Sequence, residues 1–318
     1  MLDSFGRKIN YLRVSLTDRC NLRCQYCMPE RGIDNKVSHE ELLTLEEVYL
    51  LIEKFVELGI DKIRFTGGEP LVRRGIVDLI EKVNRLKGVK DLAITTNGLL
   101  LKDMAKSLKD AGINRVNISL DTLNADRYRE ITRGGDLSLV LDGIEEAIKV
   151  GLTPIKLNSV LVGGFNEDEI GDLVDLTRSG IDVRFIELMP IGEAMHFAED
   201  KFVSNSKVLE TIGDLIPTEI DDKSSPAVYY RLPNAKGKVG IINPISCKFC
   251  DNCNRIRLTS TGKLKTCLHS NREIDLKEAI RSQNDIKEII RNGILDKEES
   301  HHLEEGKYAY RNMNQIGG

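Results

Sequence analysis

The chain has 318 residues, of which 41% are hydrophobic and 30% are charged. This composition is that of a globular protein with a substantial core, which excludes a disordered or fibrous protein. The net charge of −4 argues against a sequence-independent nucleic-acid binder, because such binding needs a basic face. We also find no apolar run of about 18 residues for a membrane helix and no apolar export segment near the start, so we expect a cytoplasmic protein.

The first part of the chain alternates short β-type runs with amphipathic helical segments. Such an alternation predicts an α/β fold with a parallel sheet, and right-handed crossovers would curl the sheet. A complete barrel would need eight βα units, whereas only six are apparent, so we expect an incomplete (βα)6 TIM-like barrel. The expected strands are 11–17, 62–68, 91–98, 115–121, 154–162 and 182–190, and the expected helices include 45–59 and 105–113.

The pattern changes after residue 190. A helical piece at 206–215 leads to short strand-like runs at 227–232 and 238–242, then to a hairpin at 255–268 and two helices. We therefore expect a partial barrel over residues 1–195 and a C-terminal α+β region over residues 196–318. The boundary is soft, because the second region is expected to close the open side of the barrel rather than to fold separately.

Seven cysteines fall into two groups near opposite ends of the chain. In a cytosolic protein such clusters indicate metal or redox sites rather than disulfides. The first group, with C-x3-C-x2-C spacing, follows the first strand at its carboxyl end, where parallel α/β folds place their chemistry. Three thiolates can hold three corners of a [4Fe–4S] cubane, although zinc with a remote ligand or free buried cysteines also fit. The groups are Cys20, Cys24, Cys27 and Cys247, Cys250, Cys253, Cys267.

The second group alone fits a four-thiolate zinc ribbon as well as an iron–sulfur site. Cationic residues inside strand-like runs add a separate observation: Arg13, Arg64, Lys156 and Arg184 each sit within one. If these strands line a barrel, alternate side chains point inward and the cations could converge on a polyanion such as a triphosphate. Any one of them alone would more often be solvated. The five histidines are expected at the surface, with no catalytic role.

Two motifs together resemble a known family. C-x3-C-x2-C with Tyr26 before its last cysteine, followed by the strand end KIRFTGGEP, is similar to the radical S-adenosylmethionine enzymes. In that family the open iron binds the amino and carboxylate groups of S-adenosylmethionine, and cleavage of the sulfonium gives a 5′-deoxyadenosyl radical. A longer set of motifs resembles the GTP 3′,8-cyclases of molybdenum cofactor biosynthesis: LRVSLTDRCNLRCQYCMP, IRFTGGEPLVRR, TTNGLLL, NISLDTL, RFIELMPIG, CKFCDNCNRIRL and the ending MNQIGG.

This resemblance implies a role for each matched position. It implies one [4Fe–4S] cluster on Cys20, Cys24 and Cys27, and a second on Cys250, Cys253 and Cys267, whose open iron would receive the guanine base. The implied ligands of S-adenosylmethionine are Tyr26, Gly68, Ser119 and Met189. The implied GTP-binding residues are Arg13, Arg64, Thr95, Lys156, Arg255, Ile256 and Arg257, with Lys62 and Arg184 as further members of the lining.

Three of these arginines, Arg13, Arg255 and Arg257, are the implied catalytic residues. Cys247 is an extra thiol relative to the family pattern and could occupy the open coordination position of the second cluster. In the family the Gly-Gly ending reaches into the active site, so Gly317 and Gly318 are expected beside the same arginines rather than as a frayed end.

The implied reaction begins with removal of the C3′ hydrogen of GTP and addition of the C3′ radical to C8 of guanine. Reduction of the resulting aminyl radical by one electron and a proton, assisted by the second cluster or a nearby arginine, then gives 3′,8-cyclo-7,8-dihydro-GTP. The implied partners are a cyclic pyranopterin monophosphate synthase in the same pathway, an electron donor and a second copy of the chain, with no nucleic acid and no membrane. Two alternatives remain: another radical S-adenosylmethionine enzyme with an auxiliary cluster acting on a peptide or tetrapyrrole, and a non-catalytic electron carrier or zinc-stapled module.

Overall fold

The computed structural model describes residues 1–32, 37–38, 40–219, 222–305 and 308–317. Its strands form a 12-stranded sheet in the order β12-β11-β10-β1-β2-β3-β4-β5-β6-β9-β8-β7. The strands are β1 Tyr11–Ser15, β2 Lys62–Thr66, β3 Asp91–Thr96, β4 Arg115–Ser119, β5 Ile155–Leu161, β6 Asp182–Glu187, β7 Ile216–Pro217, β8 Ala227–Arg231, β9 Val239–Ile242, β10 Arg255–Leu258, β11 Lys263–Lys265 and β12 Ile274–Asp275.

Strands β1 to β6 are parallel neighbours in chain order, which confirms the predicted partial barrel. The C-terminal region extends both edges of this barrel. Strand β10 pairs in parallel with β1, and β9 pairs in parallel with β6. Antiparallel partners then continue the sheet outward on each side. The second cysteine group therefore lies next to the first strand of the barrel, although it is far away in the sequence.

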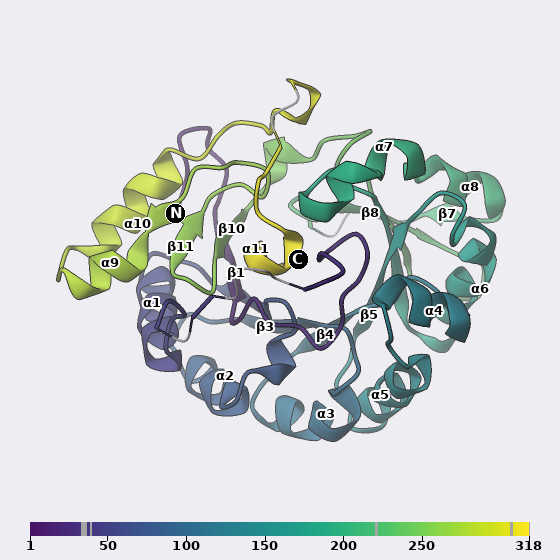
Figure 1. Ribbon diagram of the computed structural model, residues 1–318, viewed down its shortest axis with the longest axis horizontal. Helices are drawn as coiled ribbons and strands as arrows, with labels where there is room; N and C mark the ends of the chain where they lie inside the picture. The colour runs from purple at the N-terminus through teal and green to yellow at the C-terminus, as the bar shows by residue number, and fades with distance from the viewer. Residues whose placement is uncertain (33–36, 39, 220–221, 306–307, 318) are drawn as a thin grey trace.

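Helices α1, α2, α3, α5 and α6 cover the outside of the curved sheet, whereas α4 hydrogen-bonds to the first cysteine loop. The C-terminal helix α11 lies at the centre of the ring of strands in the view of Figure 1. Helix α1 begins where expected, because Thr44 and Glu47 form a reciprocal capping box. Helix α3 begins earlier than predicted, at Leu101, because Leu101, Ala105 and Leu108 together make its buried face. The helices are α1 Leu45–Glu57, α2 Ile76–Asn84, α3 Leu101–Asp110, α4 Ala125–Thr132, α5 Leu137–Lys149, α6 Ile170–Asp175, α7 Ala198–Lys201, α8 Ser206–Thr211, α9 Leu276–Arg281, α10 Ile286–Leu295 and α11 Met313–Ile316.

The two faces of the barrel strands differ in character, since side chains alternate along a strand. In β2, Ile63 and Phe65 belong to the hydrophobic core beneath the outer helices. Arg64, between them, occupies the opposite face. In β10 the core residue Ile256 likewise separates Arg255 from Arg257. The alternation directs cationic side chains to the inside of the barrel. No helix among the described residues has the length and apolar character to cross a membrane.

Candidate active site

The first cysteine loop leaves the carboxyl end of β1 and folds into a tight turn. The backbone N–H groups of Cys27 and Met28 both donate to the carbonyl of Cys24, at 2.9 and 3.0 Å. Burial raises the pKa of the Cys20 thiol to about 11 and that of Cys27 to about 12. The pKa of Cys24 is also raised well above its ordinary value, first by burial and then by the neighbouring Cys27 and Asp121. These thiols lie close enough to influence one another, and they favour the protonated form until a metal binds.

The GGEP segment after β2 is joined to this loop by backbone hydrogen bonds. Gly68 N donates to Thr17 O at 2.7 Å, and Glu69 N donates to Arg19 O at 2.8 Å. A Cβ atom on Gly68 would lie 2.4 Å from Arg19 O, so only glycine permits this approach. Packing against the cysteine loop thus accounts for Gly68. Its predicted contact with S-adenosylmethionine stays a prediction.

Glu69 is buried and connects the GGEP segment to the end of β3. Its carboxylate accepts from Thr96 Oγ1 at 2.8 Å and from Asn97 N at 2.7 Å. The side-chain amide of Asn97 in turn lies 3.7 Å from Cys20 Sγ. Burial raises the pKa of Glu69 to about 7 in spite of these donors. Glu69 therefore fixes the backbone from which Asn97 reaches a predicted cluster ligand.

Tyr26 is anchored by the end of β4. Its hydroxyl donates to Asp121 Oδ2 at 2.7 Å, while Asp121 Oδ1 accepts from Val160 N at 2.8 Å. Burial raises the pKa of Asp121 to about 6 and the pKa of Tyr26 well above its ordinary value. The contact links the first cysteine loop to β4 and β5. Asp121 was missed by the sequence analysis, although it stands in the quoted run NISLDTL.

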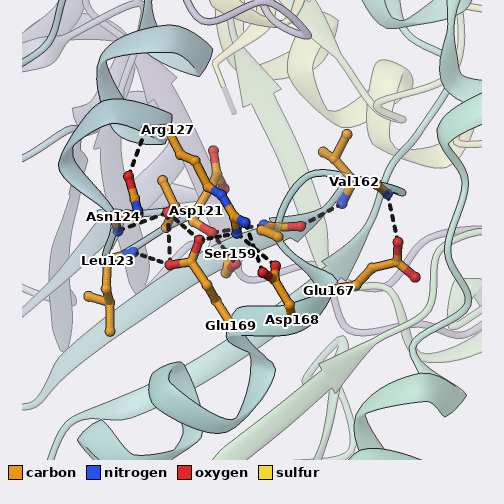
Figure 2. A network of polar contacts seen from close by, with 12 residues as sticks. Asp121, Leu123, Asn124, Arg127, Ser159, Val162, Glu167, Asp168 and Glu169 are labelled. Atoms are coloured by element: carbon orange, nitrogen blue, oxygen red, sulfur yellow. Dashed lines mark hydrogen bonds and ion pairs between the residues drawn. The ribbon is translucent and has the colours of Figure 1, made fainter.

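A polar network beside Asp121 joins the loops that follow β4 and β5 (Figure 2). The carboxylate of Glu169 accepts from Leu123 N at 2.7 Å and from Arg127 at 2.9 Å, and Arg127 also pairs with Asp168 at 2.7 Å. The side chain of Asn166 donates to the carbonyl of Asp121 at 2.8 Å. The network holds the backbone on which Asp121, and through it Tyr26, depends.

The other two residues predicted to bind S-adenosylmethionine lie at the same end of the sheet. Ser119 is the last residue of β4 and is half-buried. Met189 follows β6 and packs with Ile191, Ala309 and Ile316 in a small apolar cluster. This cluster contains part of the C-terminal helix, so the Met189 segment and the tail are held together.

The second cysteine loop lies between β9 and β10, in a more basic environment. Burial raises the pKa of Cys253, but the charges of Lys297 and Arg255 outweigh burial and bring that pKa below its ordinary value. Burial raises the pKa of Cys250, whose neighbours include Cys267 and Cys253. Cys247 is the one exposed cysteine among the described residues, whereas the other six are partly buried. Its exposure separates Cys247 from the predicted trio.

The histidine prediction is wrong for two residues. His269 is 9% exposed and His301 is 6% exposed, and their rings stand 4.7 Å apart beside the second cysteine group. His269 belongs to the segment after Cys267 and His301 to the segment after α10, and the contact between their rings shows that these two segments pack against each other. No sequence pattern predicts this pairing, because the two histidines lie in loops that are far apart along the chain. His196 is exposed, His302 is partly exposed, and His39 lies outside the described residues.

Cationic side chains line the barrel interior between the two loops. In the parallel register Arg13 faces both Arg64 and Arg257, while Arg255 stands one layer below beside Tyr11. Arg64, Arg184, Arg255 and Arg257 are all less than 10% exposed. The predicted Thr95 lies on the same face of the sheet, beside Asn117 of β4. The interior therefore brings together most of the residues predicted to bind the substrate.

The interior cations repel one another and have few anionic partners. Burial, followed by the charges of Arg257 and Arg64, holds the pKa of Arg13 well below its usual range. Burial lowers the pKa of both Arg64 and Arg257 to about 10. Several buried polar atoms have no hydrogen-bond partner among the described residues: Arg13 Nε, Arg64 Nε, Thr95 Oγ1, Arg184 Nε and Arg255 Nε. A buried group of this kind suits a polyanionic ligand, which would neutralise the charges and accept from the free donors.

Three of the remaining predicted residues have a different setting. Lys156 Nζ pairs with Asp182 at 3.0 Å, so part of its charge is already neutralised. Lys62 pairs with Asp222 at 3.0 Å at the edge of the interior. The side chain of Ile256 is fully buried in the hydrophobic core and faces away from the arginines. Ile256 therefore does not contribute its side chain to the cationic group.

The C-terminal tail enters the barrel and bridges the two halves of the site. Asn314 Nδ2 donates to Asp18 O at 3.0 Å near the first cysteine loop. At the other end of helix α11, Arg257 Nη1 donates to the carbonyl of Gly317. Gly317 has φ +75°, and a Cβ there would lie 2.9 Å from Thr66 Oγ1. The tail is therefore packed rather than frayed up to Gly317, and Gly318 lies outside the described residues.

The donor sets fit iron–sulfur clusters in their chemistry. The first trio lies within one loop, and the second flanks the β10–β11 hairpin, with Cys250 and Cys253 before β10 and Cys267 after β11. Cysteine thiolates are the usual ligands of such clusters. Leu22 N and the amide of Asn97 both point at Cys20 Sγ, at 3.4 and 3.7 Å, as donors to a ligating sulfur do. Among the described residues, no group of three or more Cys, His, Asp or Glu side chains is placed to hold a single metal ion.

Comparison with known proteins agrees with this architecture. A family model described as "Radical SAM superfamily" matches residues 14–177, and one described as "Molybdenum Cofactor Synthesis C" matches residues 181–303. Among solved structures, Streptococcus suis SuiB aligns with a TM-score of 0.64 at 15% identity, over 97% of this chain and 77% of that chain. At this identity the likeness supports the fold alone. By fold and matched sequence, the class is that of radical S-adenosylmethionine enzymes.

Relatives that match this chain over nearly their whole length narrow the radical S-adenosylmethionine class to one family. A protein named GTP 3′,8-cyclase from Alkaliphilus oremlandii (strain OhILAs) is 57% identical over 322 residues, which cover 100% of both chains. Another of that name from Peptoclostridium acidaminophilum is 57% identical over 320 residues, covering 100% of this chain and 98% of the relative. The chain belongs to the GTP 3′,8-cyclase family of the radical S-adenosylmethionine superfamily.

Proposed function

We propose that this protein is a GTP 3′,8-cyclase that uses S-adenosylmethionine and two [4Fe–4S] clusters to convert GTP into 3′,8-cyclo-7,8-dihydro-GTP for molybdenum cofactor biosynthesis. The observation that carries the proposal is the group of buried arginines between the two cysteine loops. A triphosphate carries three to four negative charges near neutral pH, so several guanidinium groups in one enclosed space are suited to it. Membership of the GTP 3′,8-cyclase family supports GTP as this polyanion.

In this proposal Cys20, Cys24 and Cys27 hold the first cluster, and Cys250, Cys253 and Cys267 hold the second. When bound, the first cluster and S-adenosylmethionine supply a 5′-deoxyadenosyl radical. Tyr26, Gly68, Ser119 and Met189 are the residues we assign to S-adenosylmethionine, and all four lie at the carboxyl ends of the barrel strands.

The arginines hold the substrate between the two loops. Arg13, Arg64, Arg184, Arg255 and Arg257 would bind and orient the nucleotide, with Thr95, Lys156 and Lys62 at the margins of the group. The carbonyl of Gly317 fixes Arg257 Nη1, and so the tail holds that guanidinium in one orientation. We assign Arg13, Arg255 and Arg257 to the cyclisation, where fixed cations would stabilise the negative charge that the guanine ring gains when the radical formed by ring closure takes up an electron.

We also propose partners for this protein and a cytoplasmic location. The product would pass to a cyclic pyranopterin monophosphate synthase, and an electron donor would reduce the clusters. A homodimer is also part of the proposal. All seven cysteines are free in the structure, which suits the reducing conditions of the cytoplasm.

Labelled substrate tests the proposed function. Reconstituted protein is incubated anaerobically with a reductant, S-adenosylmethionine and GTP that carries deuterium at C3′. We expect 5′-deoxyadenosine to gain the deuterium and the nucleotide to lose it, giving a new compound with the elemental composition of unlabelled GTP, as mass spectrometry after chromatography would detect. The Arg64→Gln variant should need a much higher GTP concentration, whereas Arg85→Gln, on an exposed surface, should match the wild type. Unlabelled 5′-deoxyadenosine with unchanged GTP would contradict the proposal.

A further inference from the structure

We propose that Arg7 is a positioning residue that fixes the second cysteine loop and sets the reduction potential of the cluster it holds, and that Arg133 has the corresponding position at the first loop. The inference rests on the second cluster of the proposed function but not on GTP as the substrate. Neither arginine belongs to the interior cationic group. Both donate to backbone carbonyls of a cysteine loop that lies far away in the sequence, 243 positions for Arg7 and Cys250 and 105 positions for Arg133 and Met28.

Arg7 joins three segments around the second cysteine loop. Its side chain is 6% exposed, and Nη1 donates to the carbonyl of Cys250 at 3.0 Å. The same guanidinium donates to the carbonyl of Glu299 at 2.6 Å and to that of Glu298 at 2.7 Å. Its Nε pairs with Asp3 at 2.6 Å, and the Asp3 side chain is fully buried. The guanidinium of Arg7 therefore donates to one carboxylate and three backbone carbonyls at once, and no other side chain has enough donors in this geometry.

The position of Arg7 has an electrostatic consequence for a cluster. A positive charge beside iron–sulfur ligands stabilises the reduced, more negative form and so raises the reduction potential. Replacement by glutamine would remove this charge and leave the buried carboxylate of Asp3 without its charged partner, while the backbone N–H groups of Phe5 and of residue 7 still donate to it. Both changes place more negative charge near the second cysteine loop, so both lower the reduction potential.

Other contacts would keep the second loop attached when Arg7 is replaced. Glu187, at the end of β6, accepts from Ile245 N at 3.1 Å and from Ser246 N at 3.0 Å. His301 Nε2 lies 3.1 Å from the carbonyl of Pro244. These contacts hold the start of the loop, whereas Arg7 holds its Cys250 end. A change at Arg7 should therefore alter the cluster rather than release the whole loop.

Arg133 supplies the matched case at the first loop. It follows helix α4, and its Nη1 donates to the carbonyl of Met28 at 2.8 Å and to that of Arg23 at 3.2 Å. These two carbonyls flank Cys24 and Cys27 in the sequence. The pair of arginines allows a crossed experiment, because each is near one loop and remote from the other.

The experiment is a redox titration of the full chain with both clusters reconstituted, followed by electron paramagnetic resonance. The signal that changes when S-adenosylmethionine is added identifies the first cluster, and the insensitive signal identifies the second. Arg7→Gln should lower the midpoint potential of the insensitive signal only. Arg7→Lys keeps the charge but not the forked donors, so it should restore most of the potential while the line shape stays altered. Arg133→Gln should alter only the sensitive signal.

Two results would overturn the inference: an unchanged insensitive signal in Arg7→Gln, or equal shifts of both signals in that variant. If Arg7→Gln binds less iron than the wild type or unfolds, Arg7→Lys decides. If Arg7→Lys binds both clusters and only its insensitive signal changes, the inference is supported. If Arg7→Lys has wild-type signals, or loses both clusters, the inference is contradicted. Since no nucleotide is present, this outcome is independent of the labelling test with GTP.

Discussion

The two cysteine loops lie in opposite electrostatic surroundings. In the first loop, burial and the nearby carboxylate of Asp121 raise the pKa of Cys24 well above its ordinary value. In the second loop, Lys297 and Arg255 bring the pKa of Cys253 below its ordinary value although burial opposes them. The same ligand type in the same fold therefore meets an apolar and partly anionic site at one end and a basic site at the other.

This contrast fits two different tasks. An anionic and apolar setting opposes the addition of an electron to a cluster, so the first cluster should be the stronger reductant. The cleavage of a sulfonium needs such a reductant. The basic setting of the second loop continues into the interior arginines, which suits the docking of an anionic nucleotide. The tail connects the two settings, because Asn314 contacts the first loop while Gly317 contacts Arg257.

Removal of either trio of thiols should give the largest effects and separate the two tasks. Replacing Cys20, Cys24 and Cys27 by serine should remove about half of roughly eight irons per chain and abolish the cleavage of S-adenosylmethionine. Replacing Cys250, Cys253 and Cys267 should also remove about half of the iron but leave some cleavage without cyclisation. Iron analysis and chromatography of 5′-deoxyadenosine measure both. Stoichiometric zinc at the second cysteine group would show that this group holds a zinc ion and not a second iron–sulfur cluster.

Displacement of the tail should have the next largest effect. In Gly317→Ala the new Cβ would lie 2.9 Å from Thr66 Oγ1 at a φ of +75° that is strained for alanine, so the tail or Thr66 must shift, which would disturb the contact between Gly317 and Arg257. We expect cyclisation to fall at least about tenfold, since a misplaced catalytic group commonly costs more than this, with iron content unchanged. Gly151→Ala is the matched control, because Gly151 has a similar φ of +70° but no atom within 4 Å of the added Cβ. Equal activity in the two variants would mean that the tail does not orient Arg257.

The sequence predicted the parts of this site that depend on local spacing. The alternation in KIRFT placed Arg64 on the inner face of the sheet, and the cysteine spacing located both loops, whereas Arg255 and Arg257 were expected there only from the family resemblance. Parallel β order then predicted the partial barrel. These inferences needed only the periodicity of a strand and the position of a loop after it.

Contacts between distant segments could not be predicted in this way. Arg7 and the Cys250 carbonyl are 243 positions apart, and Tyr26 and Asp121 are 95 positions apart. Strands β9 and β10 join opposite edges of the sheet, and no local pattern distinguishes those edges. The burial of His269 and His301 likewise follows from two loops that meet only in the folded chain.

The anchor of the first loop should give an intermediate effect. Tyr26→Phe removes the hydroxyl that donates to Asp121 and leaves a buried carboxylate without this donor. Loss of a hydrogen bond to a charged group costs about 1.5–3 kcal/mol, so the melting temperature should fall by several degrees. S-adenosylmethionine should bind several-fold more weakly by anaerobic titration. Tyr128→Phe is the control, since the buried hydroxyl of Tyr128 has no hydrogen-bond partner among the described residues. Similar losses in both variants would point to general packing.

Cys247 should give the smallest effect and completes the comparison. The first loop has three cysteines, whereas the second group has four, so the second cluster keeps an open iron only if one thiol does not bind it. Cys247 is the exposed member, and Cys253 is the member whose pKa is lowered by neighbouring cations. Cys247→Ser should therefore retain the full iron content, both paramagnetic signals and the wild-type cyclisation rate, whereas Cys250→Ser should lose the second cluster. If Cys247→Ser loses the second cluster while Cys250→Ser keeps it, then Cys247 rather than Cys250 is a cluster ligand. The open iron that is proposed to receive the substrate would then be a different one.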